Sequence, residues 1–249
     1  MIKILYINPS GTGVFDRHFQ GLLNAAASSG THVDTTHLSL REKVTNPFLS
    51  SLPFYQGELF RTIKRAEEDG YDAVIIGCCS DPGLRAAKRT ASIPVVAPLE
   101  AGLLLASVLA ERVSVITPGP LSEVAWIEDS ARSYGLEHKI ASILIAEVAY
   151  PPPDDIEKMM IENPEQVAHI ILESHEQSIR GDVLQKARKA IECDGAGVLY
   201  LACTFWTGML ASLEQKLGIP MIDPGFAALG IAEVLANRES KLTGEHNRL

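Results

Sequence analysis

The sequence predicts an α/β protein with parallel sheets flanked by helices, arranged as two related halves. Short β-branched runs alternate with helical patterns along the chain, an order that is typical of parallel sheets covered by helices. Residues 71–106 and 197–232 also share one pattern: strand, cysteine, helix, Ile-Pro, strand, proline, helix. The repeat predicts two pseudo-symmetric lobes that face each other, with the active site between them.

The two copies align with nearly constant spacing. Their cysteines, Cys78 and Cys203, lie 203 − 78 = 125 residues apart, and the prolines of the Ile-Pro steps, Pro94 and Pro220, lie 220 − 94 = 126 residues apart. One inserted residue therefore separates the copies. We expect one of these cysteines on either side of whatever binds between the lobes.

The individual elements follow from the same patterns. Asp81-Pro82 is predicted to cap a helix with proline at its first position, and Gly218 to end one. A helical pattern over 164–191 contains Gly181, where we expect a break or two helices. The predicted strands cover 2–7, 74–77, 95–96, 113–117, 140–148, 198–202 and 220–222, and further predicted helices cover 16–29 and 57–69.

The length of the chain sets its domain organisation. A chain of 249 residues is long enough for one large domain or for two lobes of roughly 100 to 150 residues each. We place the first lobe in residues 1–98, completed by 224–249, and the second in 99–223.

Composition argues against several classes of partner. The chain has 22 basic and 31 acidic residues and a net charge of −9, without a basic cluster, so we expect neither nucleic acid nor an anionic membrane as partner. The longest apolar stretch centres on residues 103–110, far short of the ~20 residues that span a bilayer. The expected partner is therefore a small-molecule substrate.

The N-terminus and the cysteines indicate the compartment. The first residues pass directly into a Pro/Ser/Gly loop, so we predict an initial strand and not a signal peptide, and a cytoplasmic location. The four cysteines have no paired spacing, and a reducing compartment would keep them as thiols.

Cys78 and Cys203 are the candidate catalytic residues. Each follows an apolar strand and precedes a predicted helix, which places it at the carboxyl end of a parallel sheet, where open α/β folds bind ligands. A nearby helix N-terminus favours a thiolate. A thiolate on one face of a substrate could remove a proton from an acidic stereocentre while a thiol delivers one from the other face, with backbone N–H groups holding the enolate oxygen.

Packing is the alternative explanation, because cysteine is among the most buried residue types. Recurrence at two strand exits favours chemistry, since a core residue has no need to recur there. Cys79 could instead ligate a metal or pair with Cys78, but no Cys-x-x-Cys or nearby histidine supports a metal, and disulfides between adjacent residues are strained. We expect Cys193 to be inert packing.

Other polar and aromatic residues complete the candidate site. Asn8 and Ser10 lie in a loop, 7–13, that could hold an anion or carbonyl or be a plain turn, and Thr117 lies in its counterpart, 115–120. The loop fails both nucleotide-binding patterns. Phe205 and Trp206 either wall the pocket or fill the lobe interface. The histidines, including His169 and His175, show no metal-ligand spacing, and we assign most of them to solvated or capping positions.

At these residues the chain resembles the aspartate/glutamate/hydantoin racemase superfamily, and most closely its hydantoin and allantoin racemase branch. The resemblance covers nearly the whole chain. Its most specific block is Cys-x-x-Asp-Pro-Gly-Leu, residues 78–84, and other matching segments are 7–9, 94–96, 115–117, 201–203 and 219–223.

The resemblance implies two flavodoxin-like lobes, a homo-oligomer, and cofactor-free two-base racemisation by Cys78 and Cys203. It also implies that Asn8, Thr117 and the backbone amides after each cysteine hold the substrate. The candidate substrate-binding residues are therefore Asn8, Ser10, Cys79, Ser80, Thr117, Thr204 and Phe205, and neither a metal nor a cofactor is expected.

The chain departs from the family pattern beyond its second cysteine. Where hydantoin racemases have Gly-Cys-Ala-Gly-Met, residues 202–206 are Ala-Cys-Thr-Phe-Trp. The Cys-Thr pair resembles the second cysteine site of the aspartate racemase and maleate isomerase branches, which act on carboxylates.

We interpret the protein as an isomerase, a cofactor-independent racemase of a 5-substituted hydantoin or an allantoin-like ureide. A racemase or cis-trans isomerase of small carboxylates is the first alternative, and a non-catalytic binding protein of the same fold is the second. Few basic residues lie near the strand ends apart from Arg85 and Lys88, which favours a neutral substrate.

Overall fold

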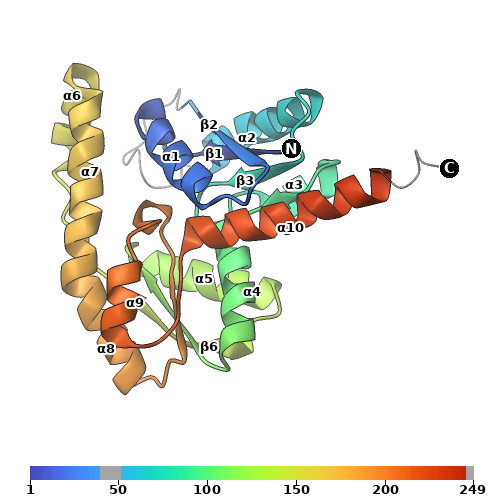
Figure 1. Cartoon of the computed structure of the whole chain (residues 1–249). Helices are drawn as coiled ribbons and strands as arrows, with labels where there is room; N and C mark the ends of the chain where they lie inside the picture. The colour runs from blue at the N-terminus through green and yellow to red at the C-terminus, as the bar shows by residue number, and fades with distance from the viewer. Residues whose placement is uncertain (40–51, 245–249) are drawn as a thin grey trace. The chain divides into compact units, whose positions relative to one another are not determined.

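The computed structural model describes residues 1–39 and 52–244. These residues form two four-stranded sheets flanked by helices, and the strands within each sheet are parallel (Figure 1). The chain divides into two compact units, Met1–Ala97 with Ala228–Leu249, and Pro98–Ala227. The predicted α/β fold class is confirmed. The predicted lobe boundaries at 98 and 224 stay a prediction.

The first unit is built around a sheet with the strand order β2-β1-β3-β4. Its central strand β1 is almost wholly buried, because its apolar side chains pack on both faces of the sheet. Ser28, just beyond α1, donates its hydroxyl to Glu233 of α10 at 2.9 Å, which ties the C-terminal helix to this unit. The elements are β1 (Ile2–Asn8), α1 (Asp16–Ala26), β2 (Thr31–His37), α2 (Leu52–Glu68), β3 (Ala73–Ile76), α3 (Leu84–Thr90), β4 (Val95–Val96) and α10 (Pro224–Gly244).

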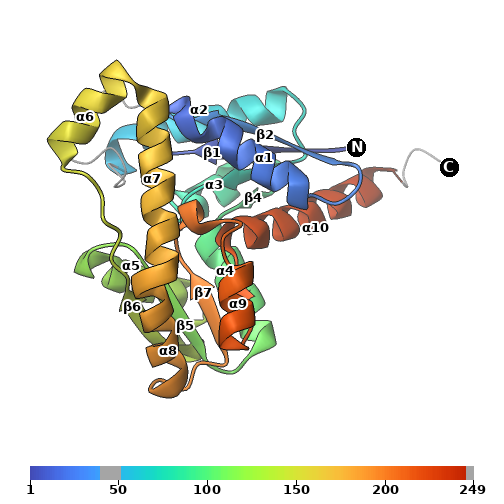
Figure 2. The ribbon, with the colours of Figure 1, turned by 60° about the vertical axis from the view of Figure 1, so that its left-hand side comes forward.

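The second unit repeats this design with the order β6-β5-β7-β8. Helix α8 crosses one face of the sheet and α4 the opposite face (Figure 2). Its elements are α4 (Pro98–Leu109), β5 (Val113–Thr117), α5 (Leu121–Ser133), β6 (Ile140–Ile145), α6 (Pro153–Glu162), α7 (Pro164–Ser178), α8 (Leu184–Glu192), β7 (Val198–Leu201), η4 (Thr204–Trp206), α9 (Ala211–Leu217) and β8 (Met221–Ile222).

The two sheets correspond strand by strand. In each, the first strand of the unit pairs in parallel with the third, with Ile7 opposite Ile76 and Ile116 opposite Leu201. Each cysteine of the repeat is the second residue after the end of that third strand. The internal repeat seen in the sequence is therefore a repeat of topology.

Two local features differ from the sequence analysis, and one agrees with it. Strand β2 was not predicted, because its Thr-His-Val-Asp-Thr-Thr-His sequence is mostly polar and it lies at the edge of its sheet. Asp81-Pro82 does not begin a helix: α3 begins at Leu84, after Gly83 in a left-handed conformation. Gly218 ends α9 with φ 71°, as predicted.

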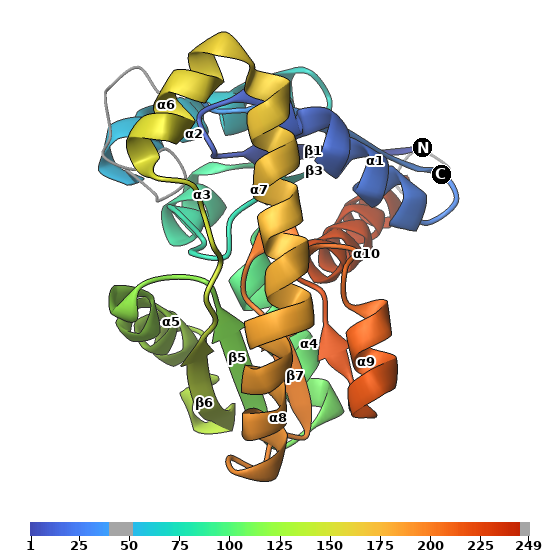
Figure 3. The ribbon, with the colours of Figure 1, turned by 90° about the vertical axis from the view of Figure 1, so that its left-hand side faces the viewer.

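The helical region around Gly181 is continuous. A π-helical segment, Ile179–Val183, joins α7 to α8, and Figure 3 shows the two helices as one long rod. We expected a break or two helices at this glycine, and the structure has a local change of helical geometry instead. In residues 1–39 and 52–244, no helix is long and apolar enough to cross a membrane.

Candidate active site

The turn that carries Cys78 is fixed by backbone hydrogen bonds. Gly77 N–H donates to the carbonyl of Ile7 at 2.8 Å, which extends the pairing of β1 and β3 by one residue. The Asp81 N–H then closes the turn by donating to the Cys78 carbonyl at 3.0 Å. Position 77 must be glycine, because a Cβ there would lie 2.3 Å from the ring of Tyr6.

Cys203 lies in a turn with the same hydrogen bonds. Ala202 N–H donates to the Ile116 carbonyl at 2.7 Å, and Trp206 N–H closes the turn by donating to the Cys203 carbonyl at 3.0 Å. The two thiols are thus presented by turns with the same pattern of backbone hydrogen bonds in the two units. Both cysteines are half-buried, and neither forms a disulfide.

The surroundings of Cys78 are polar. Its sulfur lies 3.0 Å from the hydroxyl oxygen of Ser80, which is buried. Cys79, the adjacent cysteine, is also buried. Tyr55 of α2 is close enough that burial, and then a negative charge at Cys78, raise the pKa of its phenol. A hydroxyl beside a sulfur can donate to a thiolate, so Ser80 can stabilise the ionised form of Cys78.

Cys203 has a different neighbour, a fully buried histidine from α7. Its sulfur lies 3.7 Å from Nε2 of His175. The Nδ1 of this ring lies 2.9 Å from the carbonyl oxygen of Ile171, which can only accept a hydrogen bond, so Nδ1 carries a proton. Burial lowers the pKa of His175 to about 4, against the weaker opposing effect of the Ile171 carbonyl. The imidazole is therefore neutral near pH 7, with its lone pair on Nε2.

Tyr150 completes this cluster. Its hydroxyl lies 2.9 Å from Nε2 of His175, so the phenol donates to the lone pair. Burial is the main cause that raises the pKa of Tyr150, and a negative charge at Cys203 adds to it. The phenol therefore stays protonated throughout the physiological range.

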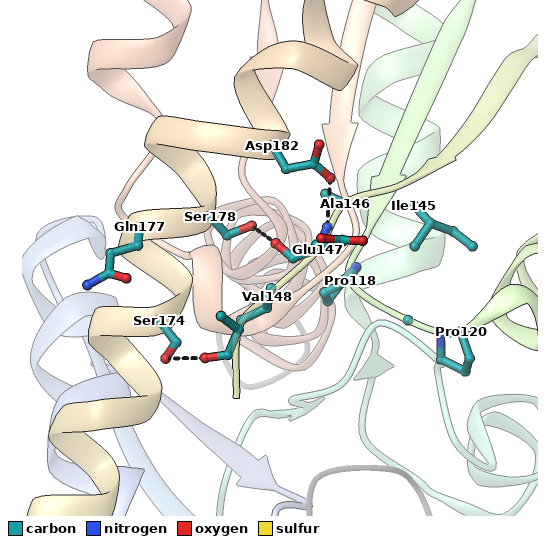
Figure 4. Close-up of a pocket in the computed structure, with 12 residues that line it drawn as sticks. Pro118, Pro120, Ile145, Ala146, Glu147, Val148, Ser174, Gln177, Ser178 and Asp182 are labelled. Carbon is teal, nitrogen blue, oxygen red and sulfur yellow. Dashed lines mark hydrogen bonds between the residues drawn. The ribbon is translucent and has the colours of Figure 1, made fainter. Parts of the chain in front are cut away.

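The segment that carries Tyr150 is pinned to the α7 rod (Figure 4). Ser178 donates to the carbonyl of Glu147 at 2.6 Å, and Asp182 accepts from the N–H of the same residue at 2.8 Å. Ser174 donates to the carbonyl of Ala149 at 2.9 Å. These three bonds hold the chain from β6 to Tyr150 alongside the helix and in the opposite chain direction, so Tyr150 and His175 are positioned together.

The same segment lines a cavity of about 570 Å³ at the carboxyl end of β5 and β6. Residues 118–120, 145–149 and four side chains of the rod, Ser174, Gln177, Ser178 and Asp182, surround it. Its wall begins at Pro118, directly after Thr117, and includes neither Cys203 nor Phe205. The cavity thus lies at the sheet edge where α/β units bind ligands, beside the turn that carries Thr117.

The aromatic residues after Cys203 have separate roles. Trp206 is fully buried in the core of the second unit, among residues such as Ile179 and Leu210. Trp206 therefore belongs to the core of this unit, and it does not line the cavity described above. Phe205 is half-buried, and its ring packs on that of His175 with centroids 4.9 Å apart and planes tilted by 32°. Phe205 consequently supports the imidazole, a contact that the sequence did not predict.

The remaining predicted substrate-binding residues brace their own turns. The amide oxygen of Asn8 accepts from Ser10 N–H at 3.0 Å, and its NH₂ group donates to Asp16 at 3.3 Å. Ser10 donates to the Thr12 carbonyl at 3.3 Å. Thr117 is buried and accepts from Gly119 N–H at 3.4 Å. Contact of these residues with substrate stays a prediction.

The structure brings the predicted residues together in two groups. Cys78, Cys79 and Ser80 share one turn beside the end of β1, which carries Asn8. Cys203, Thr204 and Phe205 share the other turn, beside the end of β5, which carries Thr117. The predicted helix starts are more distant than expected, because α3 begins only at Leu84 and α9 only at Ala211. Among the described residues, no three His, Cys, Asp or Glu side chains form a group suited to a metal ion.

His175 is the main residue that the sequence analysis missed. A signal for it existed, because it falls on the buried stripe of α7 formed by Val167, Ala168, Ile171, His175 and Ser178. A histidine on such a stripe is enclosed by packing and must find hydrogen-bond partners inside the protein. His175 is therefore an exception to the solvated or capping positions that we assigned to most histidines.

Two matched parallel sheets, each with a thiol at the carboxyl end of its third strand, define an α/β enzyme of two related halves. The sequence pattern of the Asp/Glu/hydantoin racemase family matches residues 4–232, and the chain belongs to this family of isomerases.

Individual relatives agree with this assignment. The chain is 29% identical over 240 residues to a hydantoin racemase of Pseudomonas sp. (strain NS671), covering 96% of this chain and 88% of the relative. It is 28% identical to a hydantoin racemase of Paenarthrobacter aurescens, covering 94% and 91%. The solved structure of an allantoin racemase from Klebsiella pneumoniae shares the fold with a TM-score of 0.76 and 23% identity, covering 96% of this chain and 89% of that chain.

Proposed function

We propose that the protein is a cofactor-independent racemase that inverts an acidic stereocentre α to a carbonyl by means of Cys78 and Cys203. The observation that carries the proposal is the equivalence of the two cysteines, which occupy the same position in two turns with the same backbone hydrogen bonds. A thiol that only filled space would not require this repeated presentation at the strand exit.

The proposed reaction moves two protons. One sulfur, as thiolate, takes the proton from the stereocentre, and the electron pair of the broken C–H bond delocalises onto the carbonyl oxygen as an enolate. The other sulfur, as thiol, then gives its proton to the opposite face of the same carbon. The product is the mirror-image substrate, and the two sulfurs have exchanged protonation states.

We propose a 5-substituted hydantoin or an allantoin-like ureide as the substrate. The names of the two relatives above support this class, because both match nearly the whole chain. The positions of the cations also support a neutral ring: Arg85 and Lys88, the basic residues nearest the Cys78 turn in sequence, are exposed on α3. A carboxylate substrate would need a cation or several hydroxyls directed at it.

Hydrogen exchange tests this proposal directly. A single enantiomer of a 5-substituted hydantoin, incubated with the protein in heavy water, should gain deuterium at C5 and lose optical activity. The same result is expected in the presence of a chelator and without added coenzyme. Loss of the activity in chelator, or activity only with pyridoxal phosphate or a nicotinamide, would contradict the two-thiol mechanism.

A substrate panel separates the alternatives. Exchange on aspartate, glutamate or maleate but not on hydantoins would replace the ureide by a carboxylate while retaining the chemistry. Saturable binding of a hydantoin without any exchange would identify a binding protein of the same fold.

A further inference from the structure

The two thiols have neighbours of different hydrogen-bonding character, because only the neighbour of Cys78 can donate to a thiolate. Ser80, beside Cys78, carries a hydroxyl that can donate to a thiolate. His175, beside Cys203, presents the Nε2 lone pair, which can only accept from a thiol. Since a donor stabilises the ionised form of a neighbouring group and an acceptor stabilises the protonated form, the two environments favour different protonation states.

The surrounding structure keeps Nε2 of His175 as a hydrogen-bond acceptor beside Cys203. The Ile171 carbonyl, on the same helix, fixes the proton on Nδ1. The rings of Phe205 and Trp206, from the turn after β7, lie against the imidazole with centroids 4.9 Å and 6.2 Å away. Tyr150, from the segment after β6, contacts Nε2 and shares its lone pair with the Cys203 thiol. The imidazole can therefore neither rotate nor change its tautomer without losing these contacts.

We propose that His175 is a positioning residue that holds Cys203 as the thiol, whereas Ser80 favours the thiolate of Cys78, so that the resting protein is asymmetric. This proposal rests on the proposed function and deepens it. In the resting state Cys78 is the base and Cys203 the acid. The enantiomer whose α-proton faces Cys78 can therefore react with the resting protein directly. After turnover Cys78 holds the proton and Cys203 is the thiolate, and exchange of both sulfurs with solvent restores the resting state.

The experiment measures each thiol without substrate. Trace iodoacetamide alkylates thiolates, and peptide mass spectrometry gives the rate at each cysteine as a function of pH. We expect the half-maximal rate of Cys78 at least about one pH unit below that of Cys203, which corresponds to about tenfold more thiolate at neutral pH. Equal midpoints, or a lower midpoint for Cys203, would overturn the proposal.

If His175 acts as an acceptor, two variants should shift the pH midpoint of Cys203 alkylation in opposite directions. Tyr150→Phe removes the hydroxyl that shares the Nε2 lone pair, so the thiol gains the whole acceptor and the Cys203 midpoint rises. His175→Gln replaces the acceptor by an amide that can also donate, so the midpoint falls. A structural disturbance alone would shift both variants the same way, and that result would refute the role of His175.

Controls keep the outcome specific. Ser80→Ala should raise the midpoint of Cys78 and leave that of Cys203 unchanged. His169→Gln changes an exposed histidine on the same helix and should alter neither. Circular dichroism confirms that each variant is folded. Because alkylation needs no substrate, a failed deuterium experiment would reject the proposed function without affecting this result, and the converse also holds.

Discussion

The turns after Cys78 and Cys203 share their backbone hydrogen bonds but have different side chains. With the offset of 125 residues, Ser80 corresponds to Phe205 and Asp81 to Trp206, so two polar residues in the first unit stand where the second has two aromatic rings. The reason lies in what covers each turn. In the second unit α7 packs on η4, and the rings fill the space between the helix and the turn. The two turns thus share their backbone hydrogen bonds, whereas the environments of the two thiols differ.

Replacing either thiol tests whether the two turns share one reaction, and we expect the largest effect here. Cys78→Ser and Cys203→Ser should each reduce racemisation by at least about a thousandfold, because an alcohol is too weak an acid to supply the base at neutral pH. The measurement is loss of optical activity of a hydantoin. Cys79→Ala and Cys193→Ala should retain most activity. If Cys79→Ser proved as damaging as Cys78→Ser, the choice between the adjacent cysteines would be wrong.

Trp206 tests whether the aromatic residues of the second turn belong to the core. Trp206→Ala should lower the free energy of unfolding by about 3 to 5 kcal/mol, because it removes a fully buried ring. Urea denaturation measures the change. Trp206→Phe is the matched control: the indole N–H is buried without a hydrogen-bond partner, so losing it while keeping a ring should cost much less. Equal losses in the two variants would contradict this expectation, because the retained phenyl ring would then contribute nothing to stability.

The buried histidine makes the stability of the second unit depend on pH. Because the pKa of His175 is lowered to about 4 from 6.5, the unfolded chain binds a proton between these values while the folded protein does not. Stability is therefore lost as the pH falls from about 6.5 to 4, by about 3 kcal/mol.

His175→Gln isolates this effect. The difference in unfolding free energy between the wild type and the variant should shrink by about 3 kcal/mol between pH 7 and pH 4. Asp223 acts in the opposite sense, since burial raises its pKa to about 6 and its protonation favours the folded state, but it is present in both proteins and cancels. A pH-independent difference would show that folding leaves the pKa of His175 unchanged.

Phe205 gives the smallest expected change and separates support of the imidazole from contact with substrate. Phe205→Ala should lower stability by about 1 kcal/mol, because the half-buried ring loses its contact with His175. If the ring also faces the substrate, hydantoins with larger C5 groups should gain relative to small ones, within about 1 to 3 kcal/mol. An unchanged size preference would restrict Phe205 to the support of His175. Thermal melts and a series of C5 substituents provide the two measurements.

Much of the fold follows from local sequence signals. The strand exits at Cys78 and Cys203, the capping Gly218 and the repeat itself are all encoded by short patterns, because apolar β-branched runs and glycine act over a few residues. Strand β2 escaped prediction because an edge strand needs few apolar side chains, and Val33 is its one fully buried residue among those described.

The polar neighbours of Cys203 could not be predicted in the same way. His175 reaches Cys203 across 28 residues of sequence, and Tyr150 reaches His175 across 25. The first contact requires α7 to pack on the turn after β7, and the second requires the segment after β6 to be pinned to α7 by Ser174, Ser178 and Asp182. Tertiary packing therefore decides which histidine meets a thiol, and no local spacing reports it.

The π-helical segment sets the phase of the rod that carries His175. Buried positions continue at intervals of four residues, from Ile171 through His175, Ile179 and Val183 to Ala187, which is longer than the roughly 3.6 residues of an α-helical turn. The wider π-helical turn accommodates the extra residue, so the buried faces of α7 and α8 point in the same direction. Deleting one residue here would rotate one part against the other. The one extra residue of the π-helical turn, about one helical turn from His175, therefore helps to set the orientation of the imidazole toward the Cys203 sulfur.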